Sequence, residues 1–243
     1  MQQYAILTYH QIELAPPPPA AFRSLYVAPD SFARQMRWLK QLGYRGVAMR
    51  DLMPYLRGEK VGKVVGLTFD DGYCNNLHSA LPVLQDCGFT ATCYVISQLL
   101  GKTNVWDLAN GVKQADLMSA SQIKQWAQAG MEIGAHTKTH CKLPHMSDAD
   151  AAREISDCKA ELADVLGVPV EHFCYPYGFY EDRHAAMAQD AGYQSATTTL
   201  RGKVRLGADL FQLHRIPVVR STYLPQFLLK LLTGYENCKG VQT

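Results

Sequence analysis

Several features that mark whole classes of protein are missing from this chain of 243 residues. No apolar run approaches the ~20 residues that a membrane-spanning helix needs, so we expect no transmembrane segment. Basic and acidic residues nearly balance, 24 against 22, and the net charge of +2 gives no electrostatic argument for a nucleic-acid partner. Although only 19% of the residues are charged, 47% are hydrophobic, which argues against intrinsic disorder and allows a buried core.

Paired cysteine motifs are missing as well. The seven cysteines are odd in number, so they cannot all pair within one chain, and none has the Cys-x-x-Cys spacing of zinc fingers or thioredoxin-like sites. Residues 1–10 lack the basic region and long apolar core of a secretion signal. We therefore expect reduced thiols and a cytoplasmic protein, although a chain trimmed of its signal would look the same.

Short apolar runs alternate with helical patterns, which is typical of βαβ units around a parallel sheet. Strands are predicted at 5–9, 64–69, 91–96, 131–135, 172–175, 193–199 and 211–219. Helices are predicted from a cap at Asp30 and Ser31 to Gly43, and at 79–87, 121–129, 147–166, 181–191 and 223–232. The segment 101–120 has no clear pattern. Because no linker separates two cores, we expect one α/β domain over residues 1–243.

Two adjacent aspartates, Asp70 and Asp71, follow the predicted strand 64–69. They stand at the carboxyl end of a strand, where α/β folds place their sites. By itself this pattern is more typical of a strand end followed by an Asp-Gly turn. The pair becomes a candidate site together with a second element.

That second element is a pair of histidines after the predicted strand 131–135. His136 and His140 are four positions apart, a spacing that brings both rings to one point in a helical turn or a tight loop. With a strand-end aspartate they match a two-histidine, one-carboxylate metal site with open positions for water and substrate. His145 is a weaker candidate ligand, because Pro144 redirects the chain before it.

A third segment, Tyr175, Pro176, Tyr177 and the glycine after them, follows the predicted strand 172–175. A proline-aromatic-glycine turn can direct backbone N–H groups towards a site and supply a wall, so Tyr175 and Pro176 are candidate substrate contacts. Trp106 is another, since the face of a tryptophan suits the apolar face of a pyranose. Core packing is an equally good interpretation of Trp106.

Together and in this order, the three segments resemble the motifs of the polysaccharide deacetylase family, the fourth carbohydrate esterase family. Its first motif, TFDDG, stands at 68–72, and residues 136–140 fit its second motif, H-[ST]-x-x-H. Its third motif, R-x-P-Y/F, is present at 174–177 with Cys174 in place of the arginine. The likeness covers most of the chain and includes Tyr9 and His10, a pair found in a branch that resembles a circular permutation.

The resemblance implies a metal-dependent N-deacetylase on a distorted (β/α) barrel of about seven strands. Asp71, His136 and His140 would hold a divalent ion, zinc or another transition metal such as Co²⁺ or Ni²⁺. Asp70 would be the general base for a metal-bound water, and the backbone N–H of Tyr177 would help to bind the oxyanion. The implied substrate is an N-acetylated amino sugar in a glycan or a glycolipid intermediate.

The sequence departs from the family pattern at the arginine, at a fourth motif that has no clear match, and at the histidine that protonates the leaving amine. One hypothesis is that Arg215 replaces the arginine as partner of Asp70. If Arg215 faces the pocket, His214 on the same strand faces away. His10 is therefore preferred over His214 as general acid, because a barrel places the ends of all its strands on one face.

Other functions stay open at this point. The same metal site could serve a hydrolase of a non-sugar amide or cyclic imide. The missing arginine and fourth motif would also suit a catalytically inactive saccharide-binding domain, although such a domain has no need of a base beside three ligands. The apolar segment 227–232 could make a transient membrane contact, but packing against the barrel is the simpler interpretation. The oligomeric state cannot be predicted.

Overall fold

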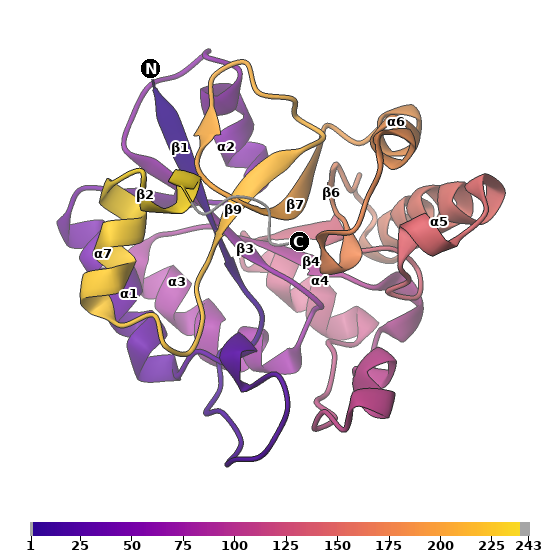
Figure 1. The fold of residues 1–243 in the computed structure, drawn as a ribbon, viewed down its shortest axis with the longest axis horizontal. Coiled ribbons are helices and arrows are strands. Elements are labelled where there is room, and N and C mark those ends of the chain that lie inside the picture. The colour runs from indigo at the N-terminus through magenta and orange to yellow at the C-terminus, as the bar shows by residue number, and fades with distance from the viewer. Residues whose placement is uncertain (1, 239–243) are drawn as a thin grey trace.

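Seven runs of mostly apolar and β-branched residues form parallel strands in the computed structural model, which describes residues 2–238 (Figure 1). In order of pairing they are β1 (Gln3–Tyr9), β3 (Val64–Phe69), β4 (Thr92–Val95), β5 (Glu132–Ala135), β6 (His172–Cys174), β7 (Ser195–Arg201) and β9 (Leu213–Pro217). Because β1 pairs with both β3 and β9, the strands close into a barrel. The predicted distorted (β/α) barrel of about seven strands is confirmed.

Helices and short strands surround this barrel. The helices are α1 (Pro29–Gln41), α2 (Met49–Leu56), α3 (Leu81–Cys87), α4 (Ala120–Gln128), α5 (Asp148–Leu166), α6 (Asp182–Asp190) and α7 (Leu224–Leu232). The short strand β2 (Arg45–Val47) pairs with the first half of β3, and β8 (Val204–Arg205) runs antiparallel to β1. Within residues 2–238, no helix has the length and apolar character to cross a membrane.

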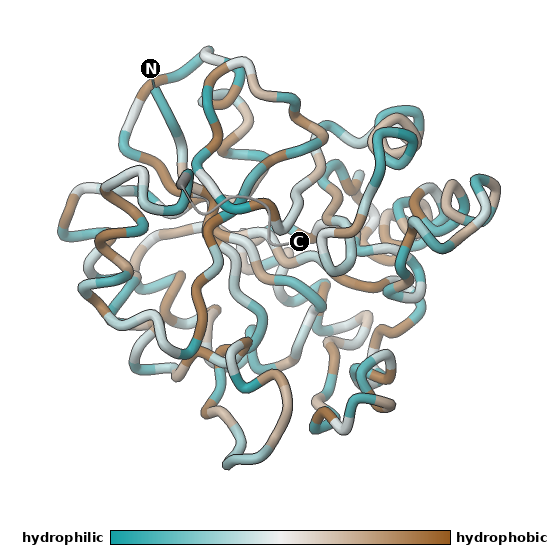
Figure 2. The backbone as a smooth tube through the Cα atoms, viewed as in Figure 1, coloured by the Kyte–Doolittle hydropathy of each residue, from teal (hydrophilic) through white to brown (hydrophobic). Residues whose placement is uncertain are grey.

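The strands are hydrophobic because both of their faces are covered. All six residues of β3 are buried, as expected for a parallel strand with side chains on one side and helices on the other. Helix α1 buries Phe32, Met36 and Leu39, which recur at helical spacing on one face. Along the outer helices, hydrophobic and hydrophilic stretches alternate (Figure 2). The core therefore fills the barrel and also the layer between barrel and helices.

Most predicted elements are present with bounds shifted by a few residues, but β2, α2 and β8 were not predicted. They are short, and α2 contains Pro54, which interrupts the pattern on which a helix is predicted. The predicted cap at Asp30 and Ser31 is wrong, because α1 begins at Pro29, after Ala28, without a side-chain cap. Proline suits the first helical position, since its missing N–H has no partner there in any helix.

The barrel brings residues from distant parts of the chain to one face. His10 follows β1, Asp70 follows β3, and His136 follows β5, while Cys174 is the last residue of β6. Since the strands are parallel, their carboxyl ends lie at the same end of the barrel. The backbone N–H of Asp70 donates to the carbonyl of Tyr9 at 2.9 Å, which holds the ends of β1 and β3 together.

Candidate active site

Three side chains meet at one carboxylate oxygen. Nε2 of His136 and Nε2 of His140 each lie 3.3 Å from Oδ1 of Asp71, and all three residues are buried. In a tetrahedral zinc site with bonds of about 2.0 to 2.1 Å, neighbouring ligand atoms are about 3.3 to 3.4 Å apart. The spacing of these donors therefore fits a zinc ion, and their ligand atoms form one of two potential metal clusters among the described residues.

Hydrogen bonds orient the candidate ligand His136 and keep Asp71 ionised. Nδ1 of His136 is 2.7 Å from the carbonyl of Cys174, and a ring that donates there is held with Nε2 towards Asp71. Burial alone would raise the pKa of Asp71, but hydrogen bonds to the two imidazoles outweigh it and hold the pKa well below its usual range. Asp71 is thus ionised, as a ligand must be.

The backbone at this site adopts a conformation that side chains usually avoid. Asp71, His140 and Tyr177 have φ values of 72°, 61° and 58°, in the left-handed region. Such residues cost of order 1 to 3 kcal/mol each and cluster at functional sites. The turn at Asp71 directs the Asp71 carboxylate to the histidines, whereas the Asp70 carboxylate points to Arg215.

Asp70 forms a bidentate ion pair with Arg215. Nη1 of Arg215 lies 2.7 Å from Oδ1 of Asp70, and Nη2 lies 2.7 Å from Oδ2. The guanidinium is itself fixed, because Nε donates to the carbonyl of Thr198 at 2.8 Å. Burial would raise the pKa of Asp70, but the charge and hydrogen bonds of Arg215 outweigh it and lower the pKa. Asp70 is therefore a buried, ionised carboxylate held by two charge-assisted hydrogen bonds.

Cys174 stands where the family motif has arginine, and it touches both members of this pair. Its Sγ lies 3.2 Å from Nη2 of Arg215 and 3.8 Å from Oδ2 of Asp70. The residue is fully buried, and the small side chain leaves room for the guanidinium of Arg215, which comes from β9, two strands along the barrel from β6. The structure thus brings Arg215 to the carboxylate, as the sequence hypothesis required.

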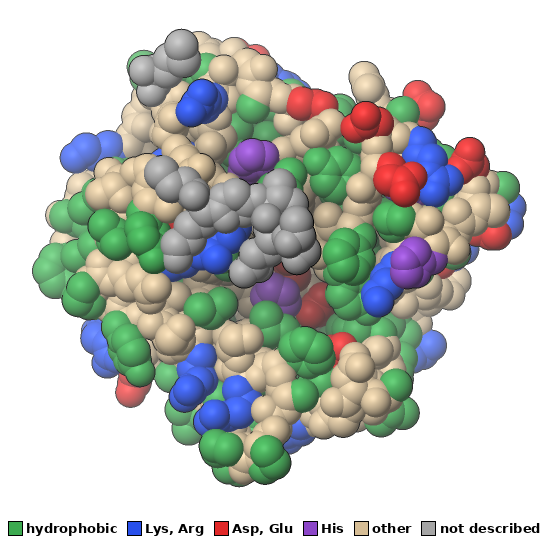
Figure 3. Space-filling view, in the orientation of Figure 1, with side chains coloured by type: hydrophobic (Ala, Val, Ile, Leu, Met, Phe, Trp, Pro, Cys, Tyr) green, Lys and Arg blue, Asp and Glu red, His purple; other side chains and the backbone are tan. Residues whose placement is uncertain are grey.

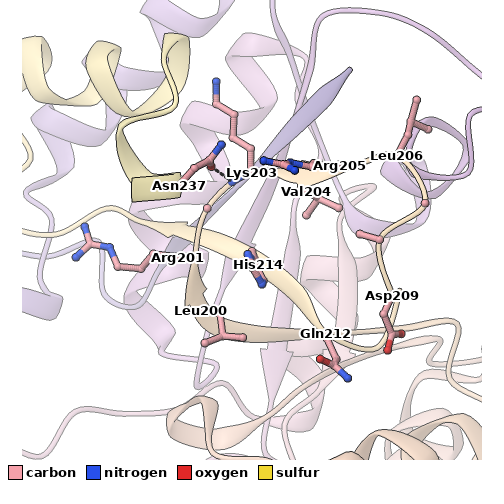
Figure 4. A pocket seen from close by; sticks show the side chains of 13 residues that line it. Leu200, Arg201, Lys203, Val204, Arg205, Leu206, Asp209, Gln212, His214 and Asn237 are labelled. Carbon is pink, nitrogen blue, oxygen red and sulfur yellow. Dashed lines mark hydrogen bonds between the residues drawn. The ribbon is translucent and has the colours of Figure 1, made fainter. Parts of the chain in front are cut away.

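The two candidate acid histidines belong to different strands: His10 follows β1, and His214 is part of β9. Nε2 of His10 is 4.0 Å from Oδ2 of Asp70, and its side chain is 25% exposed, so it can meet a substrate. His214 is exposed on the outer face of β9, where it lines a separate cavity of about 630 Å³ with Lys203 and Arg205 (Figure 4). The geometry brings His10, and not His214, to Asp70.

Two aromatic rings contact one of the two histidines. The ring of His140 is 4.3 Å from that of Trp106 and 4.5 Å from that of Tyr177, measured between centroids. Tyr175, in contrast, is fully buried, stacks on Tyr180 at 4.6 Å and donates to the carbonyl of Phe211. Its burial does not fit the predicted substrate contact.

Pro176 and His145 differ from their predicted roles as well. Pro176 is buried beneath the turn, so it offers a substrate little surface. His145 is exposed and belongs to neither of the potential metal clusters among residues 2–238.

On the face shown in Figure 3, histidine and acidic side chains gather in a hollow with hydrophobic side chains along its border.

One residue that supports the site was not predicted. Glu154 on α5 accepts hydrogen bonds from the backbone N–H groups of Lys138 and Thr139, at 2.8 and 3.0 Å, and from the Thr139 hydroxyl. It thereby fixes the loop that carries His136 and His140. The available signal was a carboxylate on the buried face of a helix, a position where charge is rare unless it is paired.

Comparison with known proteins identifies the family. Residues 57–196, more than half of the chain, match the polysaccharide deacetylase family. The chain therefore belongs to the polysaccharide deacetylase family, and the resemblance seen in the sequence is confirmed.

Individual relatives agree with this assignment. The deacetylase PplD of Streptococcus pyogenes, solved in complex with acetate, is 28% identical, with a TM-score of 0.83 over 95% of this chain and 98% of that one. IcaB from Ammonifex degensii is 25% identical, with a TM-score of 0.79 over 95% of this chain and 97% of that one. The poly-β-1,6-N-acetyl-D-glucosamine N-deacetylase of Staphylococcus epidermidis is 23% identical over 223 residues, 88% of this chain and 74% of that protein.

Proposed function

We propose that this protein removes acetyl groups from N-acetylated amino sugars, in a glycan or a glycolipid intermediate, with a divalent ion held by Asp71, His136 and His140. The observation that carries the proposal is a second ionised carboxylate, Asp70, placed beside these three residues but bound to Arg215 instead. The names of the relatives support the substrate class, since one is an N-deacetylase of poly-β-1,6-N-acetyl-D-glucosamine.

Hydrolysis of an amide needs an activated water, a stabilised oxyanion and a proton for the departing nitrogen. When bound, the ion would lower the pKa of water and polarise the acetyl carbonyl. Zinc suits this set of two imidazoles and one carboxylate, and Co²⁺ or Ni²⁺ can use the same donors.

The residues of the chain divide the remaining work. Asp70 takes a proton from the attacking water as the new C–O bond forms, and Arg215 keeps its carboxylate ionised and oriented. The backbone N–H of Tyr177 donates to the oxyanion. His10 gives a proton to the nitrogen as the C–N bond breaks, so the products are acetate and the free amine of the sugar.

Acetate release from β-1,6-linked N-acetylglucosamine oligomers tests this function. We expect one acetate for each free amine formed, loss of turnover after chelation, and recovery when Zn²⁺, Co²⁺ or Ni²⁺ is added back. A protein that binds the ion but releases no acetate from any N-acetylated sugar would instead be a hydrolase of another amide or cyclic imide. A protein that binds no ion would be a saccharide-binding domain.

A pair of histidine variants tests the assignment of the acid. His10→Ala should lower kcat by about a hundredfold, in the range typical of general acid catalysis. His214→Ala should leave kcat unchanged, because its side chain points away from Asp70. Steady-state acetate release by both purified variants measures the difference, and the opposite ranking of the two rates would reverse the assignment.

A further inference from the structure

A row of aromatic rings leads from the histidines to the surface of the protein. After the 4.5 Å step from His140 to Tyr177, the ring of Phe179 follows at 5.9 Å from Tyr177, nearly parallel to it with an angle of 29°. Tyr177 is 37% exposed and Phe179 50%. Two stacked, half-exposed rings at the edge of a catalytic site are costly to leave in water, which points to a ligand that covers them.

The backbone holds this aromatic pair in a fixed place. Tyr177 and Gly178 both have left-handed φ values, 58° and 74°, and a side chain at Gly178 would collide with that of Thr199 on β7. The Thr199 hydroxyl also donates to the carbonyl of Tyr177 at 3.3 Å. Because the turn is seated against the barrel, the rings are preorganised rather than free to fold back.

A basic side chain lies over the pair. Nζ of Lys142 is 5.5 Å from the ring centroid of Tyr177 and 5.9 Å from that of Phe179. Lys142 is exposed and comes from the loop just after His140. Any group that rests on these rings therefore lies close to a positive charge.

We infer that Tyr177 and Phe179 form a subsite for the sugar next to the one that loses its acetyl group, and that Lys142 makes this subsite selective for an uncharged neighbour. The inference rests on the proposed deacetylase function. The apolar face of a pyranose can cover an aromatic ring, so an N-acetylated sugar fits the pair. A neighbour that has already lost its acetyl group carries an ammonium, which Lys142 repels.

This selectivity would shape the product. Each deacetylation creates a sugar that the subsite disfavours, so the enzyme would leave adjacent sugars acetylated and space its free amines along the chain. A subsite without Lys142 would treat both kinds of neighbour alike.

The contribution of the ring is measured with Phe179→Ala and a fully acetylated β-1,6-linked tetramer. We expect KM to rise about tenfold with kcat within twofold, because a contact worth about 1.4 kcal/mol is lost from binding. Tyr223→Ala is the matched control, since this tyrosine is 73% exposed just before α7 and lies outside the aromatic row. An unchanged KM in an active Phe179→Ala variant overturns the subsite. Absence of acetate release by the wild-type protein would overturn the proposed function itself.

The role of the charge is measured with Lys142→Glu at neutral pH, where a sugar amine is protonated. The substrates are the acetylated tetramer and a tetramer with one free amine. The ratio of kcat/KM for the two should shift by about two- to fivefold in favour of the partly deacetylated one, as expected for an exposed charge pair.

Lys63→Glu is the control for that measurement, because Lys63 is also exposed and lies 5.9 Å from a tyrosine ring, that of Tyr44. It should leave the ratio unchanged. If the ratio of kcat/KM for the two tetramers is the same in wild type and Lys142→Glu, the charge selectivity is overturned. The aromatic subsite is then judged by the Phe179→Ala result alone.

Discussion

Replacement of Asp70 by Asn is expected to lower kcat by about a thousandfold, within the range of general base catalysis, while the protein still binds its divalent ion. Asparagine keeps the shape of the side chain but cannot accept the proton of the attacking water. Asp70 is not part of the group formed by Asp71, His136 and His140, so its amide leaves their donor atoms in place. Acetate release and metal content of the purified variant measure the two effects.

Asp71→Asn is the matched variant one residue further on. It removes the negative charge between the two imidazoles, so both metal content and turnover should fall together. If Asp70→Asn lost its metal while Asp71→Asn kept it, the roles of the two carboxylates would be exchanged. Turnover of Asp70→Asn at the rate of the wild type would show that Asp70 is not the base.

Replacement of Arg215 by Met is expected to lower the free energy of unfolding by about 3 to 5 kcal/mol, because it leaves a buried carboxylate without its partner. Arg215 is 1% exposed and Asp70 is 3% exposed, so water can replace little of the lost interaction. Urea unfolding followed by circular dichroism measures the change. The rate of acetate release should fall too, since Asp70 loses both hydrogen bonds that it accepts from Arg215.

The double variant Asp70→Asn with Arg215→Met separates the ion pair from simple packing. If the loss comes from an unpaired charge, the double variant should be more stable than Arg215→Met alone. A double variant that is less stable by the sum of both single effects would contradict this account.

Cys174→Arg in the Arg215→Met background is a further test. Sγ of Cys174 is 3.8 Å from Oδ2 of Asp70, so a guanidinium from that position should restore part of the rate of acetate release.

Local patterns in the sequence were sufficient to predict a single α/β domain and to point out candidate ligands, and the family resemblance added the barrel. Short apolar strands alternate with amphipathic helices, and period and length are properties of contiguous residues. The candidate ligands were equally visible, because Asp71 directly follows a strand and His136 and His140 are four residues apart. Helix α2 was missed because Pro54 interrupts its pattern, and β2 was missed because one of its three residues is Gly46, which disfavours a strand.

Only the tertiary structure decided which side chains surround those ligands. Arg215 reaches Asp70 across 145 positions of sequence, and Nζ of Lys142 lies 5.9 Å from the ring centroid of Phe179. Tyr175 looked like a substrate contact in its motif, yet its ring is in the core. Motifs and strand ends consist of neighbouring residues, so the sequence by itself determined the resemblance to the deacetylase family and the candidate metal ligands that this resemblance implies. The orientation of each neighbouring side chain depends on the space that distant strands leave for it. This space is defined only when the barrel closes, so local sequence cannot predict the orientation.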